Sequence, residues 1–325
     1  MKKLCYTLLL FPALLASCGD GMRTMQRVSG KAGEVVVVVD NKIWDKTVLD
    51  TVHRILAPDY PALPQREPVF DIIDMQETAF SKMFQLHRNI VLLKIAGDSV
   101  PEGLSVRHDV WAQPQTVVVV HARNGDNLIG VLAGNQERMI HILEQAERDR
   151  VIDAARKYEL KALRDTVSKR FGGSPRFPMG YTLRKATPGF VWIGSETRKA
   201  ILGVFMYSYP YRDSTTLRPQ HIIAARNAIL QREVPGQFEN TYMTTASLFR
   251  PQTRNIRYKD LHFVETRGLW DIENDFMGGP FISHTLIDST GEKALVLEAF
   301  VYHPHAGKRD YMRQLEAILY SFEWD

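Results

Sequence analysis

The segment Leu15-Ala16-Ser17-Cys18 limits what this chain can fold into more than any other feature. It follows a basic start, Lys2-Lys3, and an apolar run that is too short to span a bilayer, as in a bacterial signal peptide. A cysteine directly after Leu-Ala-Ser is typical of a lipobox, in which the thiol is acylated before residues 1–17 are removed. A secretory leader with an incidental cysteine, or a short buried helix, is the alternative interpretation.

Cysteine usage then decides how the mature chain must be stabilised. Of the two cysteines, Cys5 leaves with the leader and the sulfur of Cys18 is consumed by lipid. Disulfides, thiolate metal sites and cysteine nucleophiles are therefore excluded, and stability must come from packing of a chain that is 45% hydrophobic. The formal charge of +4 falls to about +2 once Lys2-Lys3 is removed, which is too near neutral to indicate a nucleic acid partner.

Residues 18–33 are rich in glycine and predict a flexible tether, which holds the folded part about 20 Å from the membrane. The valine run over 34–40 predicts a strand buried on both faces, and helical spacing of apolar residues predicts a helix over 43–56. No glycine-rich phosphate turn joins the two, so nucleotide binding is not indicated. Further strands are expected at 69–73, 89–96, 105–111 and 116–121, with a helix over 76–86.

A densely charged stretch over 127–170 predicts one or two long helices with a solvated face, and a dedicated partner-binding surface is the alternative. The segment Gly172-Gly173-Ser174-Pro175 interrupts this pattern. It predicts a boundary between an N-terminal half, 34–172, and a C-terminal half, 173–325.

The C-terminal half is rich in predicted strands that follow one another by short turns, which favours an antiparallel sheet with helices on one side. The predicted fold class is α+β, with a mixed sheet and helices in the first half and a mainly antiparallel sheet with a helical layer in the second. Strands are expected at 179–184, 189–193, 200–209, 242–249, 255–258, 262–266, 268–272, 281–288 and 293–302, and helices at 219–232 and 308–321.

Three segments of the second half, WDIENDFMGGPF (270–281), LVLEAFVYHP (295–304) and KRDYMRQLEAIL (308–319), together with the lipobox, resemble a known family. It is a family of lipoproteins of Bacteroides-type bacteria, described as a domain of unknown function (number 4837). The resemblance spans nearly the whole chain and implies a lipid-anchored protein of the cell envelope. It brings no known activity, so no catalytic residue and no cofactor is carried over.

The segment Gly278-Gly279-Pro280 within this motif predicts a tight turn, because paired glycines supply backbone angles that other residues resist. A loop whose amides bind an anion or a partner is the alternative. Either way, Gly278 and Gly279 are candidate surface residues.

Aromatic side chains alternate along one predicted strand as Phe205, Tyr207, Tyr209 and Tyr211, with Trp192 expected on the neighbouring strand. Such a face can stack on sugar rings or hold an extended peptide, so Tyr207, Tyr209 and Tyr211 are candidate binding residues. Aromatic strand faces are more often covered by a helix, and the helix expected over 219–232 is available to cover this one.

His303 and His305 form the strongest metal motif, since residues two apart on an extended segment project to one face. Zinc needs three or four ligands with supporting hydrogen bonds, so two exposed imidazoles are the simpler reading and no metal is predicted. Hydrolase motifs are equally weak. The chain has no Gly-x-Ser-x-Gly, Ser-x-x-Lys or His-Glu-x-x-His pattern, although a triad assembled in space is not excluded by sequence order.

The function expected from the sequence is a non-catalytic binding or assembly module, held to the membrane by acyl chains such as palmitate on Cys18. Its expected partner is a protein, glycan or lipid of the envelope, and a metal-independent envelope hydrolase is the alternative. Only Asp20 is acidic between Cys18 and Arg23, whereas surface lipoproteins of Bacteroides-type bacteria tend to carry an acidic cluster there. The expected location is therefore the outer membrane, facing the periplasm.

Overall fold

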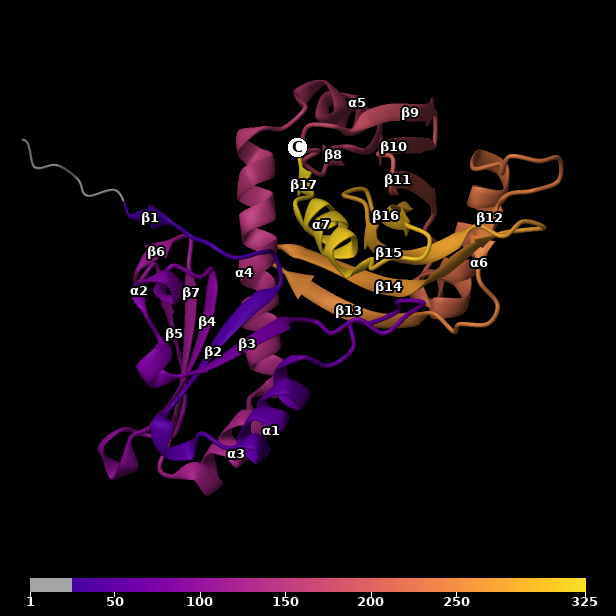
Figure 1. Cartoon of the computed structure of the whole chain (residues 1–325). Coiled ribbons are helices and arrows are strands. Elements are labelled where there is room, and N and C mark those ends of the chain that lie inside the picture. The colour runs from indigo at the N-terminus through magenta and orange to yellow at the C-terminus, as the bar shows by residue number, and fades with distance from the viewer. Residues whose placement is uncertain (1–24) are drawn as a thin grey trace, which may run out of the picture.

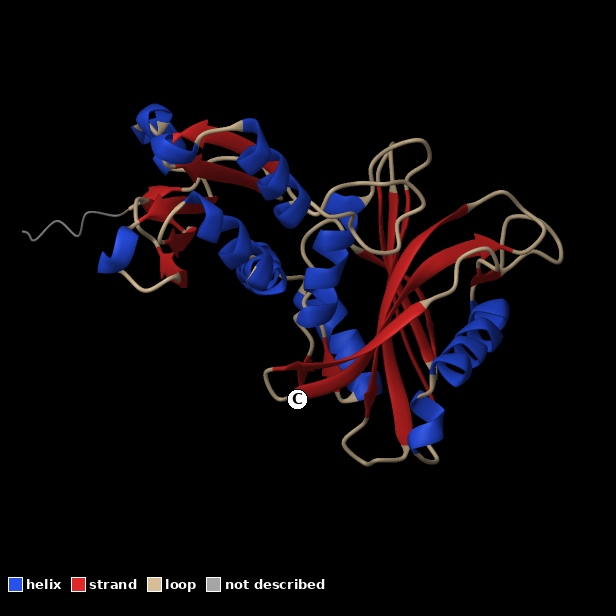
Figure 2. Cartoon of the chain, turned by 90° about the horizontal axis from the view of Figure 1, so that it is seen from below, coloured by secondary structure: helices blue, strands red, loops and turns tan. Residues whose placement is uncertain are grey.

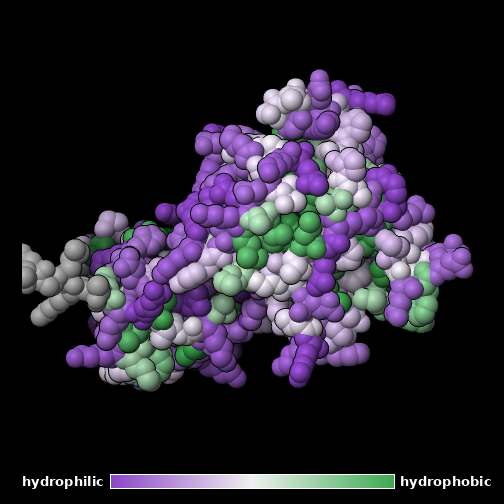
Figure 3. Space-filling model, turned by 90° about the horizontal axis from the view of Figure 1, so that it is seen from above, coloured by the Kyte–Doolittle hydropathy of each residue, from purple (hydrophilic) through white to green (hydrophobic). Residues whose placement is uncertain are grey.

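The computed structural model describes residues 25–325, in which two sheets lie on either side of one long helix, α4 (Gln136–Lys157) (Figure 1). The predicted leader and the predicted acylation site, Cys18, lie outside the described residues. None of the helices described between residues 25 and 325 is long and apolar enough to cross a membrane. The face drawn in Figure 3 is mostly hydrophilic, with hydrophobic residues gathered near its middle.

The N-terminal sheet has five strands in the order β3-β2-β4-β7-β5, parallel except for β5 at one edge. Its inner strand β2, between β3 and β4, is the predicted valine run. Val35, Val37 and Val39 face the helices, and Val36 and Val38 face a smaller cluster on the other side, so both faces are buried. The strands are β2 (Glu34–Val39), β3 (Asp71–Gln76), β4 (Asn89–Ile95), β5 (Gly103–His108) and β7 (Thr116–Ala122).

Helix α1 (Lys46–Leu56) starts where a side chain caps it. Asp45 accepts hydrogen bonds from the backbone of Thr47 and Val48, so helix α1 begins at Lys46 rather than at the predicted Ile43. The helix predicted over 76–86 is wrong, because Phe80 leaves the helical path to pack edge-on against Trp111, with ring centroids 5.5 Å apart. The elements are η1 (Asn41–Ile43), α1 (Lys46–Leu56), η2 (Glu77–Ala79), α2 (Lys82–Gln85), η3 (Gly97–Ser99), α3 (Gly125–Gly134) and α5 (Lys161–Phe171).

The C-terminal sheet is antiparallel throughout, in the order β12-β14-β15-β16-β11-β10-β9, with β13 pairing along the same edge of β14 as β12 does. Helix α6 covers one face and helix α7 the other, so this sheet has a helix on each side and the predicted placement of the helices on one side is wrong (Figure 2). The elements are β9 (Thr182–Thr187), β10 (Phe190–Glu196), β11 (Ile201–Pro210), η4 (Ser214–Leu217), α6 (Pro219–Glu233), β12 (Met243–Thr245), β13 (Gln252–Tyr258), β14 (Leu261–Ile272), β15 (Gly278–Ile287), β16 (Lys293–Tyr302) and α7 (Arg309–Tyr320).

These observations confirm the predicted α+β fold class. Two short pairings complete the description. Strand β1 (Gln26–Arg27) runs parallel to β6 (Ala112–Gln113), and β8 (Gly173–Ser174) pairs with β17 (Glu323–Trp324) near the end of the chain. The boundary predicted at Gly172 stays a prediction. That residue ends α5 with a φ of 72°, in the left-handed conformation that glycine favours.

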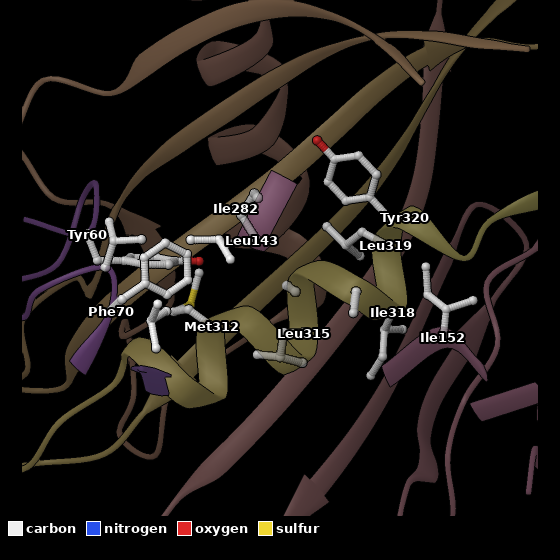
Figure 4. Close-up of a cluster of buried hydrophobic side chains, with 14 of the residues drawn as sticks. Tyr60, Phe70, Leu143, Ile152, Ile282, Met312, Leu315, Ile318, Leu319 and Tyr320 are labelled. Carbon is white, nitrogen blue, oxygen red and sulfur yellow. The ribbon is translucent and has the colours of Figure 1, made fainter. Parts of the chain in front are cut away.

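One hydrophobic core runs through both halves, and helix α7 lies at its centre (Figure 4). Met312, Leu315 and Ile318 of α7 are buried, and Leu143 and Ile152 of α4 belong to the same cluster. Burying one such side chain stabilises a fold by about 1.5–3 kcal/mol. Helices α4 and α7 therefore join segments that lie more than a hundred residues apart.

The turn predicted at Gly278-Gly279-Pro280 is wrong, because these residues lie in β15 opposite Asp271, Trp270 and Leu269. The chain reverses before them, around Asn274, whose φ is 60°. Glycine is needed at 279 for close packing, since a Cβ there would lie 2.1 Å from the carbonyl oxygen of Val301. The indole of Trp270 donates to that same oxygen at 3.2 Å, which holds the strands together at this point.

Candidate functional site

Charged and polar side chains from five elements and one loop meet beside α4, in a buried group that we call the junction cluster. Glu144 and Arg148 come from α4, and the others come from segments far away in the sequence. The cluster consists of Tyr60, Glu144, Arg148, Arg254, Glu265, Arg267, His284, Glu316 and Tyr320.

Glu316 of α7 lies at the centre of the junction cluster. Its carboxylate accepts from Arg148 at 2.8 Å, from Arg267 at 2.8 Å and from the Tyr60 hydroxyl at 2.9 Å. Burial alone would raise the pKa of Glu316, but Arg267 and Arg148 outweigh it and lower the pKa to about 2. Glu316 is therefore ionised at neutral pH and ties α4 and β14 to α7.

Glu265 of β14 forms the second centre, and it accepts from Arg254 and Arg267 at 2.8 Å each. Burial opposes its ionisation, but Arg267 outweighs burial and holds the pKa of Glu265 well below its usual range. Burial lowers the pKa of His284, whose Nε2 lies 3.7 Å from Glu265 and whose ring stacks on Phe263 with centroids 4.1 Å apart. The imidazole is therefore neutral at pH 7.

A polar cleft of about 670 Å³ opens beside the junction cluster, between α4 and β13. His141, Glu144 and Arg148 line it from α4, and Arg254 lines it from β13. Burial and the negative charge of Glu316 raise the pKa of Glu144, so two neighbouring carboxyl groups have pKa values shifted in opposite directions. Such a pair is a recurrent arrangement in acid–base chemistry.

A second cleft of about 670 Å³, which we call the apolar groove, lies between α4 and α7. Its α4 wall consists of Val151, Ala154 and Ala155, whose small side chains leave the space open. Tyr158 and Met179 stand at its rim with exposed fractions of 55% and 72%. Ala32, Arg88, Glu147, Arg150, Pro178, Asp310, Tyr311, Arg313 and Gln314 complete the lining.

The charges of α4 were expected on a solvated face, and for the middle of the helix this was wrong. Glu147 is 1% exposed and accepts from Arg88 at 3.1 Å, from Arg150 at 3.1 Å and from Asn89 at 2.6 Å. Arg148 is 7% exposed and stacks on the ring of Tyr320 at 3.9 Å. Glu144 and Arg148 lie one turn apart beside buried Leu143, and this spacing is the only sequence signal for the junction cluster.

The aromatic strand face is part of the core, as the covering-helix interpretation expected. Tyr207 is 1% exposed and packs with Phe190 and Phe205 in a cluster that includes Ile229 and Leu230 of α6. Tyr209 and Tyr211 are half-buried at and beyond the end of β11. Tyr207 is therefore not available to a ligand, and the same is true of Gly279, which is buried beside the half-buried Gly278.

An ion pair lies beneath α6 in this second core and was not predicted from the sequence. The guanidinium of Arg226, 1% exposed, donates to Glu298, 0% exposed, at 2.8–3.1 Å, and stacks on Phe281 at 3.9 Å. The Tyr207 hydroxyl donates to the same carboxylate at 3.1 Å. The carboxylate of Glu298 is thus paired within the protein.

His303 and His305 lie beyond the end of β16. The Nδ1 atom of His303 lies 2.8 Å from the carbonyl oxygen of Gly307, and its ring contacts Tyr311, while His305 is exposed with a φ of 57°. His284 of β15 and Glu298 of β16, the nearest His and Glu before them in the sequence, belong to opposite faces of the sheet. Within residues 25–325, no group of three His, Cys, Asp or Glu side chains is placed to hold a metal ion.

Solved structures share only a loose likeness with this chain, at TM-scores of 0.19–0.27. One is LpqN, involved in cell envelope biogenesis of Mycobacterium tuberculosis, at 8% identity and a TM-score of 0.27, over 45% of this chain and 79% of that chain. A Bacteroides thetaiotaomicron protein has 8% identity and a TM-score of 0.21, over 47% and 45% of the chains. The human StarD13 lipid transfer and protein localization domain has 9% identity and a TM-score of 0.19, over 50% and 95%.

None of the curated proteins matches the chain significantly. Two family models do match, each described as a domain of unknown function. DUF8532 covers residues 28–156, and DUF4837 covers residues 160–321, which include α6, α7 and the whole antiparallel sheet. The chain belongs to the domain-of-unknown-function family DUF4837, with a DUF8532 domain preceding it.

Proposed function

We propose that this chain is a non-catalytic module of the cell envelope, anchored through an acylated Cys18 to the outer membrane on its periplasmic side, that binds an envelope component in the apolar groove. The observation that carries the proposal is the groove itself. It combines a wall of small apolar side chains on α4 with two large exposed side chains, Tyr158 and Met179, at its rim. Exposed apolar surface of this kind marks interaction sites.

The pairing of the buried charges supports a binding role over a catalytic one. Glu316, Glu265 and Glu298 each accept hydrogen bonds from arginines of the same chain, so their charges are already compensated within the fold. A groove that offers apolar contact area and a few polar groups is the usual form of a small-molecule or peptide site.

Site-specific photo-crosslinking in cells tests the groove. A photoreactive phenylalanine replaces Tyr158 at the rim, and the matched control carries it at Phe276, which is exposed far from the groove lining. We expect one adduct of defined mass at position 158, whether protein or small molecule, and none at position 276. Absence of an adduct at 158, or the same adducts at both positions, would count against the groove.

The anchor is tested by replacing Cys18 with Ala and fractionating cells. Two or three acyl chains make a stable anchor and one chain only a marginal one, so we expect the native protein in the membrane fraction and Cys18→Ala in the soluble fraction. Cys5→Ala is the control, because that residue precedes the predicted cleavage site. A variant that stayed as firmly membrane-bound as the native protein would contradict acylation at Cys18.

The polar cleft favours a second candidate, a metal-independent envelope hydrolase with Glu144 as its general acid. Glu144 lines the cleft together with His141 and Arg254, which places a carboxyl group near positive charge that can hold an anionic substrate. A carboxyl with a raised pKa can donate a proton near neutral pH.

Purified peptidoglycan is the probe for this alternative. If the protein is a hydrolase, the native chain releases soluble fragments, and Glu144→Gln lowers that rate by at least a hundredfold because a general acid contributes about 10²–10⁴-fold. Glu137→Gln, at the edge of the same cleft, is the matched control and should retain the rate. Equal rates for Glu144→Gln and the native chain would exclude Glu144 from catalysis.

A further inference from the structure

We propose that the apolar groove binds a long-chain fatty acid drawn from the adjoining membrane, with its carboxylate at Arg313 and its chain along α4. This inference rests on the proposed function, because it names the ligand class of the same groove. It follows from three observations: a buried cation with unused donors, a surplus of positive charge at one end of the groove, and an apolar wall at the other.

Arg313 of α7 is the buried cation. Its side chain is 6% exposed, and only its Nη2 atom has a hydrogen bond, to the carbonyl oxygen of Val69 at 2.6 Å. Its Nε and Nη1 atoms meet no acceptor within residues 25–325, and the carboxylate of Asp310 lies 3.6 Å from Nη1. Buried donors are normally satisfied, whereas the described chain leaves these two donors unpaired on a residue that lines the groove.

The charged side chains around Arg313 carry a net positive charge, which favours an anion there. Arg88, Arg150 and Arg313 line the groove against only two carboxylates, Glu147 and Asp310. The carboxylate of Glu147 already accepts from three donors, and that of Asp310 also accepts from Arg309 at 2.9 Å. The Nε atom of Arg88 is likewise buried without an acceptor in the described part of the chain. One further negative charge is therefore favoured here.

The rest of the groove matches an alkyl chain. Val151, Ala154 and Tyr158 follow one another along the wall provided by α4, over two helical turns or about 10 Å. Pro178 and Met179 face this wall from the loop after β8. The volume of about 670 Å³ lies within the range of small-molecule sites. Just before the lining residue Ala32, residues 26–29 pack against β6 and His87, so only residues 18–25 of the predicted tether separate the groove from the membrane that supplies the ligand.

The test is calorimetric titration of the chain from residue 18 onward with Cys18→Ala, so that its own acyl groups cannot occupy the groove. Dodecanoate is expected to bind one to one, and dodecan-1-ol at least tenfold more weakly because it lacks the charge. Butanoate keeps the charge but loses the chain. We expect no detectable binding for it, since each buried methylene strengthens binding by roughly fourfold.

Two variants locate the site. Ala154→Phe fills the groove from an exposed position of α4 and should weaken dodecanoate at least tenfold, while Ala133→Phe, equally exposed on α3, should leave the affinity unchanged. Arg313→Gln should remove the preference for the acid over the alcohol. If that variant does not fold, the comparison of the two ligands on the otherwise native chain still decides the role of charge.

Equal affinity for the acid and the alcohol, or an Ala154→Phe variant that binds like Ala133→Phe, would overturn the inference. Failure of dodecanoate to bind while the crosslinker at position 158 captures another envelope component would refute the fatty acid and leave the proposed function standing. Failure of both experiments would refute both.

Discussion

Replacing Glu316 with Gln is expected to lower the free energy of unfolding by about 3–5 kcal/mol, because it removes the negative charge that compensates two buried arginines. The side chains of Arg148 and Arg267 are each 8% exposed. Arg148 would lose its paired carboxylate, and Arg267 would keep only Glu265, which it shares with Arg254. Urea unfolding at pH 7 measures the change. Glu196→Gln is the matched control, because Glu196 forms an exposed pair with Arg184 at 3.4 Å and such pairs contribute only about 0–1 kcal/mol.

The same carboxylate makes the native protein sensitive to acid. Its folded pKa of about 2 lies below the ordinary glutamate value of 4.5, so the stabilisation is complete above about pH 4.5 and is lost as the pH falls towards 2. Glu265, whose pKa is also held well below its usual range, adds to the effect with the same sign. Glu316 alone corresponds to about 3 kcal/mol.

Unfolding curves at pH 7, 5, 4 and 3 should therefore show a steep loss of stability below pH 4.5 in the native chain. Glu316→Gln, which has no proton to gain at this position, should show a smaller loss over the same range. Parallel curves for the two proteins would mean that folding does not lower the pKa of Glu316, and would contradict its ion pairs with Arg148 and Arg267.

The second large effect is expected at the pair beneath α6. Arg226→Met should cost about 3–5 kcal/mol, because Glu298 is fully buried and would keep its charge without the guanidinium. Adding Glu298→Gln removes that charge and leaves an acceptor for the Tyr207 hydroxyl. The double variant should therefore be more stable than Arg226→Met alone. If the effects of the two substitutions were independent, the double variant would be less stable than Arg226→Met.

The control for this cycle is Arg232→Met, on the same helix but 68% exposed at its side chain, which should change stability by less than about 1 kcal/mol. A double variant that loses the sum of the two single effects would show that Arg226 and Glu298 act independently. That result would contradict the bidentate geometry seen between them.

Much of the fold was predictable from local patterns. The strand predicted over 293–302 is β16, and the helix predicted over 219–232 is α6 within one residue, because alternation and helical spacing are properties of neighbouring residues. The two strands predicted at 262–266 and 268–272 are one strand, β14, in which Gly268 lies against the ring of Phe281. A glycine inside a strand and a glycine in a turn look the same in a sequence.

The candidate site was less predictable, because its residues come together from distant segments. Glu316 contacts a tyrosine 256 positions earlier in the chain and an arginine 168 positions earlier, and no pattern links residues at such separations. The apolar groove depends on the distance between α4 and α7, which packing of the shared core determines. Neither site contains a motif of fixed spacing.

The amino-acid sequence by itself determined that residues 19–325 contain no cysteine, the order of the strands and helices, and the apolar faces that they bury. Only the tertiary structure decided that Glu147 and Arg148 are buried, that Gly279 serves close packing, and that the aromatic strand is covered by α6. The physical reason is the range of the interactions. Backbone propensity and side-chain periodicity act within a few residues, whereas charge compensation and steric fit depend on which distant side chains arrive at the same place.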